Sequence, residues 1–84
     1  MYVEFLGIPR ERAGISELEI EADTLGELLR SLVARVPTLA ELVMDGSLHP
    51  SIAANLNGDE FVCDPHTKLA RNDRLLLLSA DVGG

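Results

Sequence analysis

The last two residues of the chain, Gly83 and Gly84, are the ones whose type and position most clearly suggest chemistry. Glycines lack a Cβ atom, so they can enter a narrow channel and adopt backbone angles that are closed to other residues. They would deliver a bare carboxylate to the active site of another protein. A carboxylate is a poor acyl donor and must first be activated, for example as an acyl adenylate. The sequence has no glycine-rich phosphate loop, so a partner enzyme would have to bind the ATP.

Three other side chains could in principle do chemistry, but their surroundings in the sequence argue against it. His49 and His66 lie beside prolines in predicted loops and lack the spacing of metal ligands. Cys63 falls on a short predicted strand, where a cysteine is usually a small buried apolar residue, and nothing nearby in the sequence would lower its pKa. We therefore expect no metal, no bound cofactor and no enzymatic activity of the chain's own.

The composition predicts one small globular domain. The 84 residues are 46% hydrophobic and 25% charged, enough for a single modest core. A net charge of −7 would repel nucleic acid and anionic membranes, so a basic protein is the natural partner. The single cysteine and the absence of a signal-like or membrane-spanning stretch predict a cytoplasmic protein.

The first part of the chain predicts a β-hairpin. Residues Tyr2 to Ile8 are rich in β-branched and aromatic types and form the first expected strand. A polar turn is expected over Arg10 to Gly14. Residues Ser16 to Ala22 alternate between apolar and acidic types, which predicts a half-buried second strand with its glutamates in solvent.

A helix is expected to follow over Thr24 to Val36. Thr24 can cap its first turn, and Glu27, three residues later, completes the pattern of a capping box. Leucines and valines recur at helical spacing until Pro37 stops the run. A short second helical piece around Leu39, Leu42 and Val43, an Asp45–Gly46 turn and a loop over Leu48 to Ser51 come next.

Three further strands complete the expected fold. They cover Ile52 to Leu56, Phe61 to Cys63 and Arg74 to Ser79, and Asn57–Gly58 between the first two suits a tight turn with positive φ angles. The order of elements predicts an α+β protein, a mixed sheet with one main helix packed across it and a short extra helical turn. With the last strand at the centre of the sheet beside the first, this becomes the ubiquitin-like β-grasp fold, but periodicity alone does not dictate that placement. Residues 1–79 would form the domain, and residues 80–84 a flexible C-terminal Gly-Gly tail.

The last predicted strand contains four consecutive leucines, which alternation divides between two faces. Leu75 and Leu77 are expected to face the helix, and Leu76 and Leu78 to line the open face of the sheet. Exposed leucines there would form a docking patch for a partner protein. Two alternatives stay open: all four leucines could belong to the core, or they could pack in a homodimer.

The sequence resembles the small β-grasp sulfur carriers, notably the small subunit of molybdopterin synthase and the carrier of the thiamine pathway. The resemblance covers nearly the whole chain and rests on "VEFLGIPRERAG", "DTLGELL", "NLNGDEF" and "RNDRLLLLSADVGG". It implies that an adenylyltransferase of the ubiquitin-activating type adenylates Gly84 with ATP. A sulfur donor enzyme would then convert the carboxylate to a thiocarboxylate, which gives its sulfur to a substrate on the large subunit of a sulfur-accepting synthase.

The resemblance also implies roles for individual residues. Gly84 would carry the reactive carbon and Gly83 would give clearance, while Leu76, Leu78, Asp81 and Val82 would contact partners. The segment from Thr38 to Ser51, which thiamine-type carriers lack or shorten, favours a molybdopterin-like pathway. Asp81 departs from the small apolar residues that usually precede the terminal glycines.

Two other functions are compatible with the same sequence. In the first, the chain is a ubiquitin-like modifier that is joined through Gly84 to lysines of target proteins. In the second, it is a regulatory β-grasp binding module without chemistry at its end.

Overall fold

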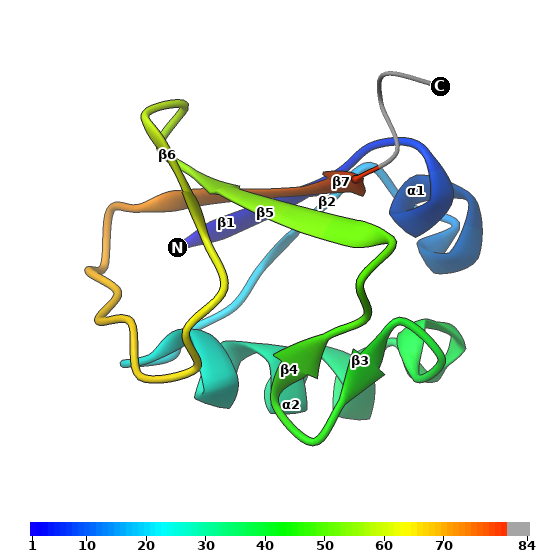
Figure 1. Ribbon diagram of the computed structural model, residues 1–84, viewed down its shortest axis with the longest axis horizontal. Coiled ribbons are helices and arrows are strands. Elements are labelled where there is room, and N and C mark those ends of the chain that lie inside the picture. The colour runs from blue at the N-terminus through cyan, green and yellow to red at the C-terminus, as the bar shows by residue number, and fades with distance from the viewer. Residues whose placement is uncertain (81–84) are drawn as a thin grey trace.

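The computed structural model describes residues 1–80 of the chain. A five-stranded sheet lies across one main helix, and a small two-stranded hairpin stands beside that helix (Figure 1). The elements are β1 (Tyr2–Phe5), α1 (Ile8–Ala13), β2 (Glu17–Glu19), α2 (Leu25–Arg35), the 3-10 turn η1 (Pro37–Leu39), β3 (Val43–Met44), β4 (Ser47–Leu48), β5 (Ile52–Leu56), β6 (Glu60–Val62) and β7 (Arg74–Ser79).

Strand β7 occupies the centre of the five-stranded sheet, whose order is β2-β1-β7-β5-β6. It runs parallel to β1, with Val3 opposite Leu75, and antiparallel to β5, with Ala54 opposite Leu77. The last strand of the chain therefore pairs with the first, as the β-grasp arrangement requires. The predicted fold class, a mixed sheet with one main helix and a short extra helical turn, is confirmed.

Helix α2 forms where the apolar spacing predicts it. The hydroxyl Oγ1 of Thr24 accepts a hydrogen bond of 3.2 Å from the backbone N–H of Glu27, so Thr24 caps the first turn. The leucines of the helical stripe, Leu25, Leu28, Leu29 and Leu32, are all completely buried. Each contributes about 2 kcal/mol of hydrophobic free energy, which fixes the helix against the sheet.

The sheet supplies the other half of the core. Val3, Phe5, Leu75 and Leu77 are buried on the face that α2 covers. Met1 is buried as well, and its amino group donates a hydrogen bond of 3.1 Å to the carbonyl of Ile20. The N-terminal strand is therefore fixed from its first residue.

The polar turn expected over residues 10–14 is wrong, because a short helix, α1, begins at Ile8. Strand β1 accordingly ends at Phe5 and not at the predicted Ile8. Pro9 lies in the first turn of α1, where its fixed φ angle fits. An N–H at this position would have no partner within the helix, so its absence costs no helical hydrogen bond. Gly14 ends the helix in the left-handed conformation, with φ of 73°.

The expectations for the segment after α2 are correct only in part. The helical piece shrinks to η1, and Val43 starts a hairpin, β3–β4, in which Leu48 is a strand residue and not a loop residue. The expected turn at Asp45–Gly46 is present, with φ angles of 47° and 82°. These positive φ angles reverse the direction of the chain at the turn. Residues whose spacing would suit a helix therefore belong to a hairpin.

The Asn57–Gly58 turn is confirmed, and it also clamps the start of β7. Both residues have positive φ, at 57° and 72°. The Asn57 side chain donates to the Asp73 carboxylate at 2.9 Å and accepts from the Arg74 N–H at 2.8 Å. The hydrogen bond from Asn57, and a second from the backbone N–H of Ala70, lower the pKa of Asp73.

We expect Asp73→Asn to reduce stability at neutral pH, and the loss to shrink in acid. A carboxyl whose pKa is lowered by folding stabilises the protein above its unfolded pKa of about 3.9, and this contribution disappears as the pH falls through the folded value. Urea unfolding of both proteins across that pH range measures the difference in free energy. A difference that stays constant with pH would contradict the role given to the ionised carboxylate.

Gly7, just before α1, is expected to tolerate no larger residue. Its φ is +64° and a Cβ added there would lie 2.5 Å from the Ser79 hydroxyl oxygen. Gly14→Ala is the matched control, since Gly14 also has positive φ but has no atom within 4 Å of an added Cβ. We expect Gly7→Ala to cost about 2 kcal/mol or more and Gly14→Ala about 1 kcal/mol in chemical unfolding. Equal losses would show that the contact with Ser79 is unimportant.

Candidate functional site

The described part of the chain ends just after β7, and the segments next to both neighbouring strands hold that end. The carbonyl of Leu77 accepts a hydrogen bond of 2.9 Å from the N–H of Leu6, which follows β1. On the other side, the N–H of Ala80 donates to the carbonyl of Ser51 at 2.7 Å. The backbone is thus fixed as far as Ala80, the first residue of the predicted tail. The predicted reactive residues Gly83 and Gly84 and the predicted contacts Asp81 and Val82 lie outside the described residues.

The leucines of β7 alternate between two faces of the sheet, as the sequence predicts. Leu75 and Leu77 are 0% and 2% exposed and face the core. Leu76 and Leu78 point to the opposite face, which no helix among residues 1–80 covers, and both are half-buried. Their predicted role as partner contacts stays a prediction, but their position leaves both accessible to a partner.

Neighbouring strands extend this open face with further apolar side chains. Ala53 of β5 lies opposite Leu78, and Asn55 lies opposite both Leu76 and Phe61 of β6. Phe61 is 68% exposed, a large fraction for an aromatic ring. We call Ala53, Phe61, Leu76 and Leu78 the apolar strip; it runs from the edge strand β6 to the place where the chain leaves the sheet.

The other half of the open face is acidic. In the register of β1 and β2, Glu4 lies opposite Glu17, and both share the face with Leu76. Arg74 forms an ion pair with Glu4, and its guanidinium lies 5.2 Å from the centre of the Tyr2 ring. A complementary protein would therefore need an apolar patch beside basic side chains.

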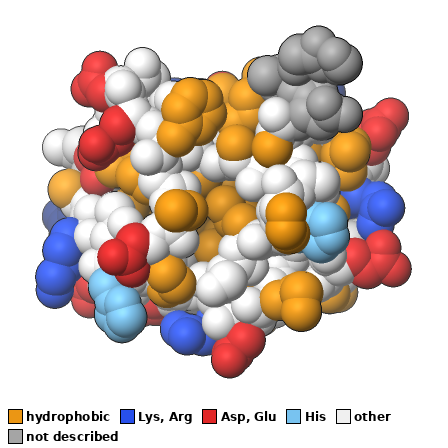
Figure 2. Space-filling model, viewed as in Figure 1, with side chains coloured by type: hydrophobic (Ala, Val, Ile, Leu, Met, Phe, Trp, Pro, Cys, Tyr) orange, Lys and Arg blue, Asp and Glu red, His pale blue; other side chains and the backbone are white. Residues whose placement is uncertain are grey.

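A hollow of about 300 Å³ lies between β6 and the β3–β4 hairpin, lined by Leu48, Pro50, Phe61 and Cys63 among others. Figure 2 looks at the side of the molecule on which β5, β6 and the β3–β4 hairpin lie, and it shows hydrophobic side chains near the centre of that side, with charged groups mostly toward its rim. Cys63 follows the end of β6 and is exposed, so the expectation that it is a buried strand residue is wrong. The lining of the hollow is mostly apolar, with Ser47 and His49 among its polar residues.

The two histidines occupy different settings. Nδ1 of His49 accepts a hydrogen bond of 3.0 Å from the N–H of Ser51. The side chain of His66 is 95% exposed, and its Nδ1 lies 3.3 Å from the carboxylate of Asp64. Within residues 1–80 no group of three or more histidine, cysteine, aspartate or glutamate side chains could hold a metal ion.

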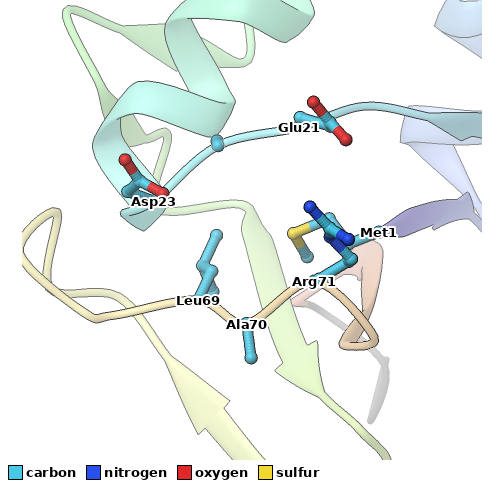
Figure 3. A pocket seen from close by; sticks show the side chains of 7 residues that line it. Met1, Glu21, Asp23, Leu69, Ala70 and Arg71 are labelled. Atoms are coloured by element: carbon cyan, nitrogen blue, oxygen red, sulfur yellow. The ribbon is translucent and has the colours of Figure 1, made fainter.

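A second cavity, of about 160 Å³, opens at the far end of the sheet from the tail. Glu21 and Asp23 lie on one side of it, and Arg71 and Leu69 lie on the other, next to the buried Met1 (Figure 3). It contains carboxylates and a guanidinium but no hydroxyl, thiol or imidazole.

Ala53, Asn55, Phe61 and Ser51 were not predicted from the sequence to be part of the site. A signal for Ala53 and Asn55 was present: because Ile52, Ala54 and Leu56 of β5 face the core, the residues between them must face the open side. Ser51 could not be found this way, since its bond to Ala80 depends on the order of the strands.

No helix within residues 1–80 has the length and apolar character needed to cross a membrane.

Comparison with known proteins supports a shared fold and a shared family. The chain is 27% identical to SAMP1 from Haloferax volcanii, with a TM-score of 0.78 over 99% of this chain and 97% of that one. It is similar to the Amycolatopsis orientalis BexX/CysO complex, with 27% identity, a TM-score of 0.80 and 99% and 98% coverage. It is also similar to a chain in the complex of subunits 1 and 2 of Molybdopterin-converting factor from Helicobacter pylori. The identity there is 26% and the TM-score 0.64, and the match covers 93% of this chain and 89% of that one.

The family comparison covers almost the whole sequence. No curated protein sequence matches the chain significantly. The ThiS family matches residues 3–84, which includes the strip-bearing strand β7 and the terminal glycines. The resemblance to small β-grasp sulfur carriers is thereby confirmed, and the chain belongs to the ThiS family.

Proposed function

We propose that the chain is a sulfur carrier in cofactor biosynthesis, and that its Gly84 carboxylate is the group that is activated and converted to a thiocarboxylate. The observation that carries this proposal is the central position of β7. It lies between two strands, it is the strand that residues 80–84 follow in the sequence, and Ala80, the first residue after it, is hydrogen-bonded to Ser51. In this proposal the folded domain only holds the C-terminal residues, and the terminal glycines have no side chains of their own.

The proposed chemistry takes place on a partner adenylyltransferase in two steps. An oxygen of the Gly84 carboxylate attacks the α-phosphorus of ATP, pyrophosphate leaves, and an acyl adenylate forms. A hydrosulfide ion then adds to the acyl carbon and AMP leaves with the bridging oxygen, which gives the thiocarboxylate and releases a proton. In the cell a sulfur donor enzyme supplies the sulfur. The thiocarboxylate is the better nucleophile and passes its sulfur to a substrate held by a synthase.

The open face of the sheet is the surface we assign to these partners. The apolar strip ends beside Ala80, so a protein docked on it would receive the C-terminal residues at its own edge. The acidic residues Glu4 and Glu17 beside the strip favour basic side chains at the rim of that partner. Two of the similar solved structures, those containing CysO and the Molybdopterin-converting factor subunits, are themselves complexes with a second protein.

For the pathway we favour a molybdopterin-like one. The segment from Thr38 to Ser51, which suggested this choice, folds into most of η1 and the β3–β4 hairpin, so it is an ordered part of the domain. Reconstitution with the large subunit of a molybdopterin synthase from the same organism would test the choice. Transfer of sulfur to its substrate is expected, and no transfer from a verified thiocarboxylate would exclude this pathway.

A second candidate function is protein modification, favoured by the similarity to SAMP1, whose full name is small archaeal modifier protein 1. Activation would be the same, but the acceptor would be a lysine of another protein. Immunoblots of cell extract distinguish the two functions, because a ladder of larger conjugates indicates modification. Lys68, the single lysine, limits self-linked chains to one branch point.

The carrier function predicts a change of mass at the C-terminus. With the adenylyltransferase of the same organism, ATP and sodium sulfide, the intact protein should exchange one oxygen for sulfur, located at Gly84 by fragmentation. A variant with one alanine added after Gly84 is the control and should fold normally but stay unmodified. An unmodified native protein in the presence of an active partner would contradict the proposal. Full cellular function of the extended variant would instead favour a regulatory module whose end has no role.

The docking surface predicts that Leu76→Asp weakens partner binding by about tenfold or more, because it places a charge within an apolar contact. Met44→Asp is the matched control, since Met44 is 67% exposed on β3, away from the open face of the sheet. Titration calorimetry with the adenylyltransferase measures both affinities. Equal affinities of the two variants would exclude the apolar strip as the docking surface.

A further inference from the structure

Ser79, the last residue of β7, makes an unusual contact with the start of α1. Strand β1 ends at Phe5, so the backbone beside Ser79 has no strand partner on that side. The Ser79 hydroxyl oxygen instead accepts a hydrogen bond of 2.9 Å from the backbone N–H of Ile8, the first residue of α1. Two segments separated by 71 positions in the sequence are joined by this bond.

The contact replaces an ordinary helix cap. The first N–H groups of a helix have no partner within the helix, and a side chain of the preceding residue usually accepts one of them. That residue here is Gly7, which has no side chain to do so. A Cβ at Gly7 would come within 2.5 Å of the Ser79 oxygen, so the glycine also leaves the space that the hydroxyl occupies.

The opposite side of the same point is also tied down. Ala80 donates to the carbonyl of Ser51. Ser51 is itself fixed, because its N–H donates to Nδ1 of His49 at 3.0 Å and its hydroxyl lies 2.8 Å from the same nitrogen. The exit of the chain is therefore held between α1 on one side and the turn before β5 on the other.

This arrangement matters because the tail is short. Four residues after Ala80 can span at most about 14 Å, so the position that Gly84 can reach depends on the direction in which the chain leaves the sheet. A freely pivoting exit would spread the carboxylate over a wide region. A fixed direction at Ala80 gives the four residues that follow it a defined starting point.

We propose that Ser79 is a positioning residue for the chemistry at Gly84: its hydroxyl, held by the N–H of Ile8, sets the direction in which the C-terminal segment enters the partner's active site. This inference rests on the proposed function, because it assumes that Gly84 is adenylated. Docking of the body on the apolar strip does not involve Ser79. The loss of the hydroxyl therefore reduces the rate within the docked complex and leaves docking itself intact.

Pyrophosphate exchange catalysed by the adenylyltransferase of the same organism, with ATP and labelled pyrophosphate, separates these two effects. Misplacing a reacting group by about an ångström can cost up to a hundredfold in rate, and we expect kcat to fall roughly tenfold in Ser79→Ala while KM for the carrier is unchanged. Ser79→Thr keeps the hydroxyl and should retain the native kcat. Ser79→Val has the shape of the threonine variant without its hydroxyl oxygen, and it should show the reduced kcat. Amide exchange at Ile8 should accelerate in the alanine and valine variants.

Asp73→Asn is the matched control, since it weakens the clamp at the other end of β7 and leaves the exit untouched. It should lower stability but keep kcat. The positioning role of Ser79 is wrong if the alanine and valine variants, shown by circular dichroism to be folded, exchange pyrophosphate at the native kcat. It is also wrong if Asp73→Asn lowers kcat as much as these two variants do. If the native protein itself supports no exchange with an active partner, the proposed function fails, which is a different result.

Discussion

The burial of β7 between β1 and β5 is the constraint on which the rest of the structure depends. A strand at the centre of a sheet has both edges hydrogen-bonded, and Leu75 and Leu77 anchor it further in the core beneath α2. Because this is also the last strand, the most firmly held part of the backbone leads directly into the terminal segment. Its opposite face carries Leu76 and Leu78, so the same six-residue strand links the core, the open face and the exit of the chain.

Each end of β7 has its own side-chain clamp. At its start, Asn57 bonds both Asp73 and the backbone of Arg74, which fixes the register at which the strand enters the sheet. At its end, Ser79 and Ala80 bond α1 and the turn before β5. These contacts are exposed and each contributes only about 1 kcal/mol, so their effect is to set direction more than overall stability.

Much of this arrangement could be predicted from the sequence because it follows from local periodicity. The leucine stripe of α2, the Thr24 cap, the Asn57–Gly58 turn and the two faces of β7 each depend on residues close together in the chain. Helix α1 was missed because six residues containing a proline carry too little periodicity to identify a helix. The β3–β4 hairpin was missed because two-residue strands have no alternation to detect. The contacts of Ser79 and Ser51 depend on the order of the strands, which no local pattern encodes.

In this protein the part that holds the C-terminal segment is distinct from the group that we propose to react. Its described residues provide a compact body with one covered and one open sheet face, and the group that we propose to react, the carboxylate of Gly84, belongs to the residues that follow them. The most direct measurement is mass spectrometry of the C-terminal peptide from protein isolated from its own cells, after trapping with an alkylating reagent. The account predicts a population of chains with an alkylated thiocarboxylate on Gly84. Only free carboxylate, in cells whose adenylyltransferase is active, would contradict it.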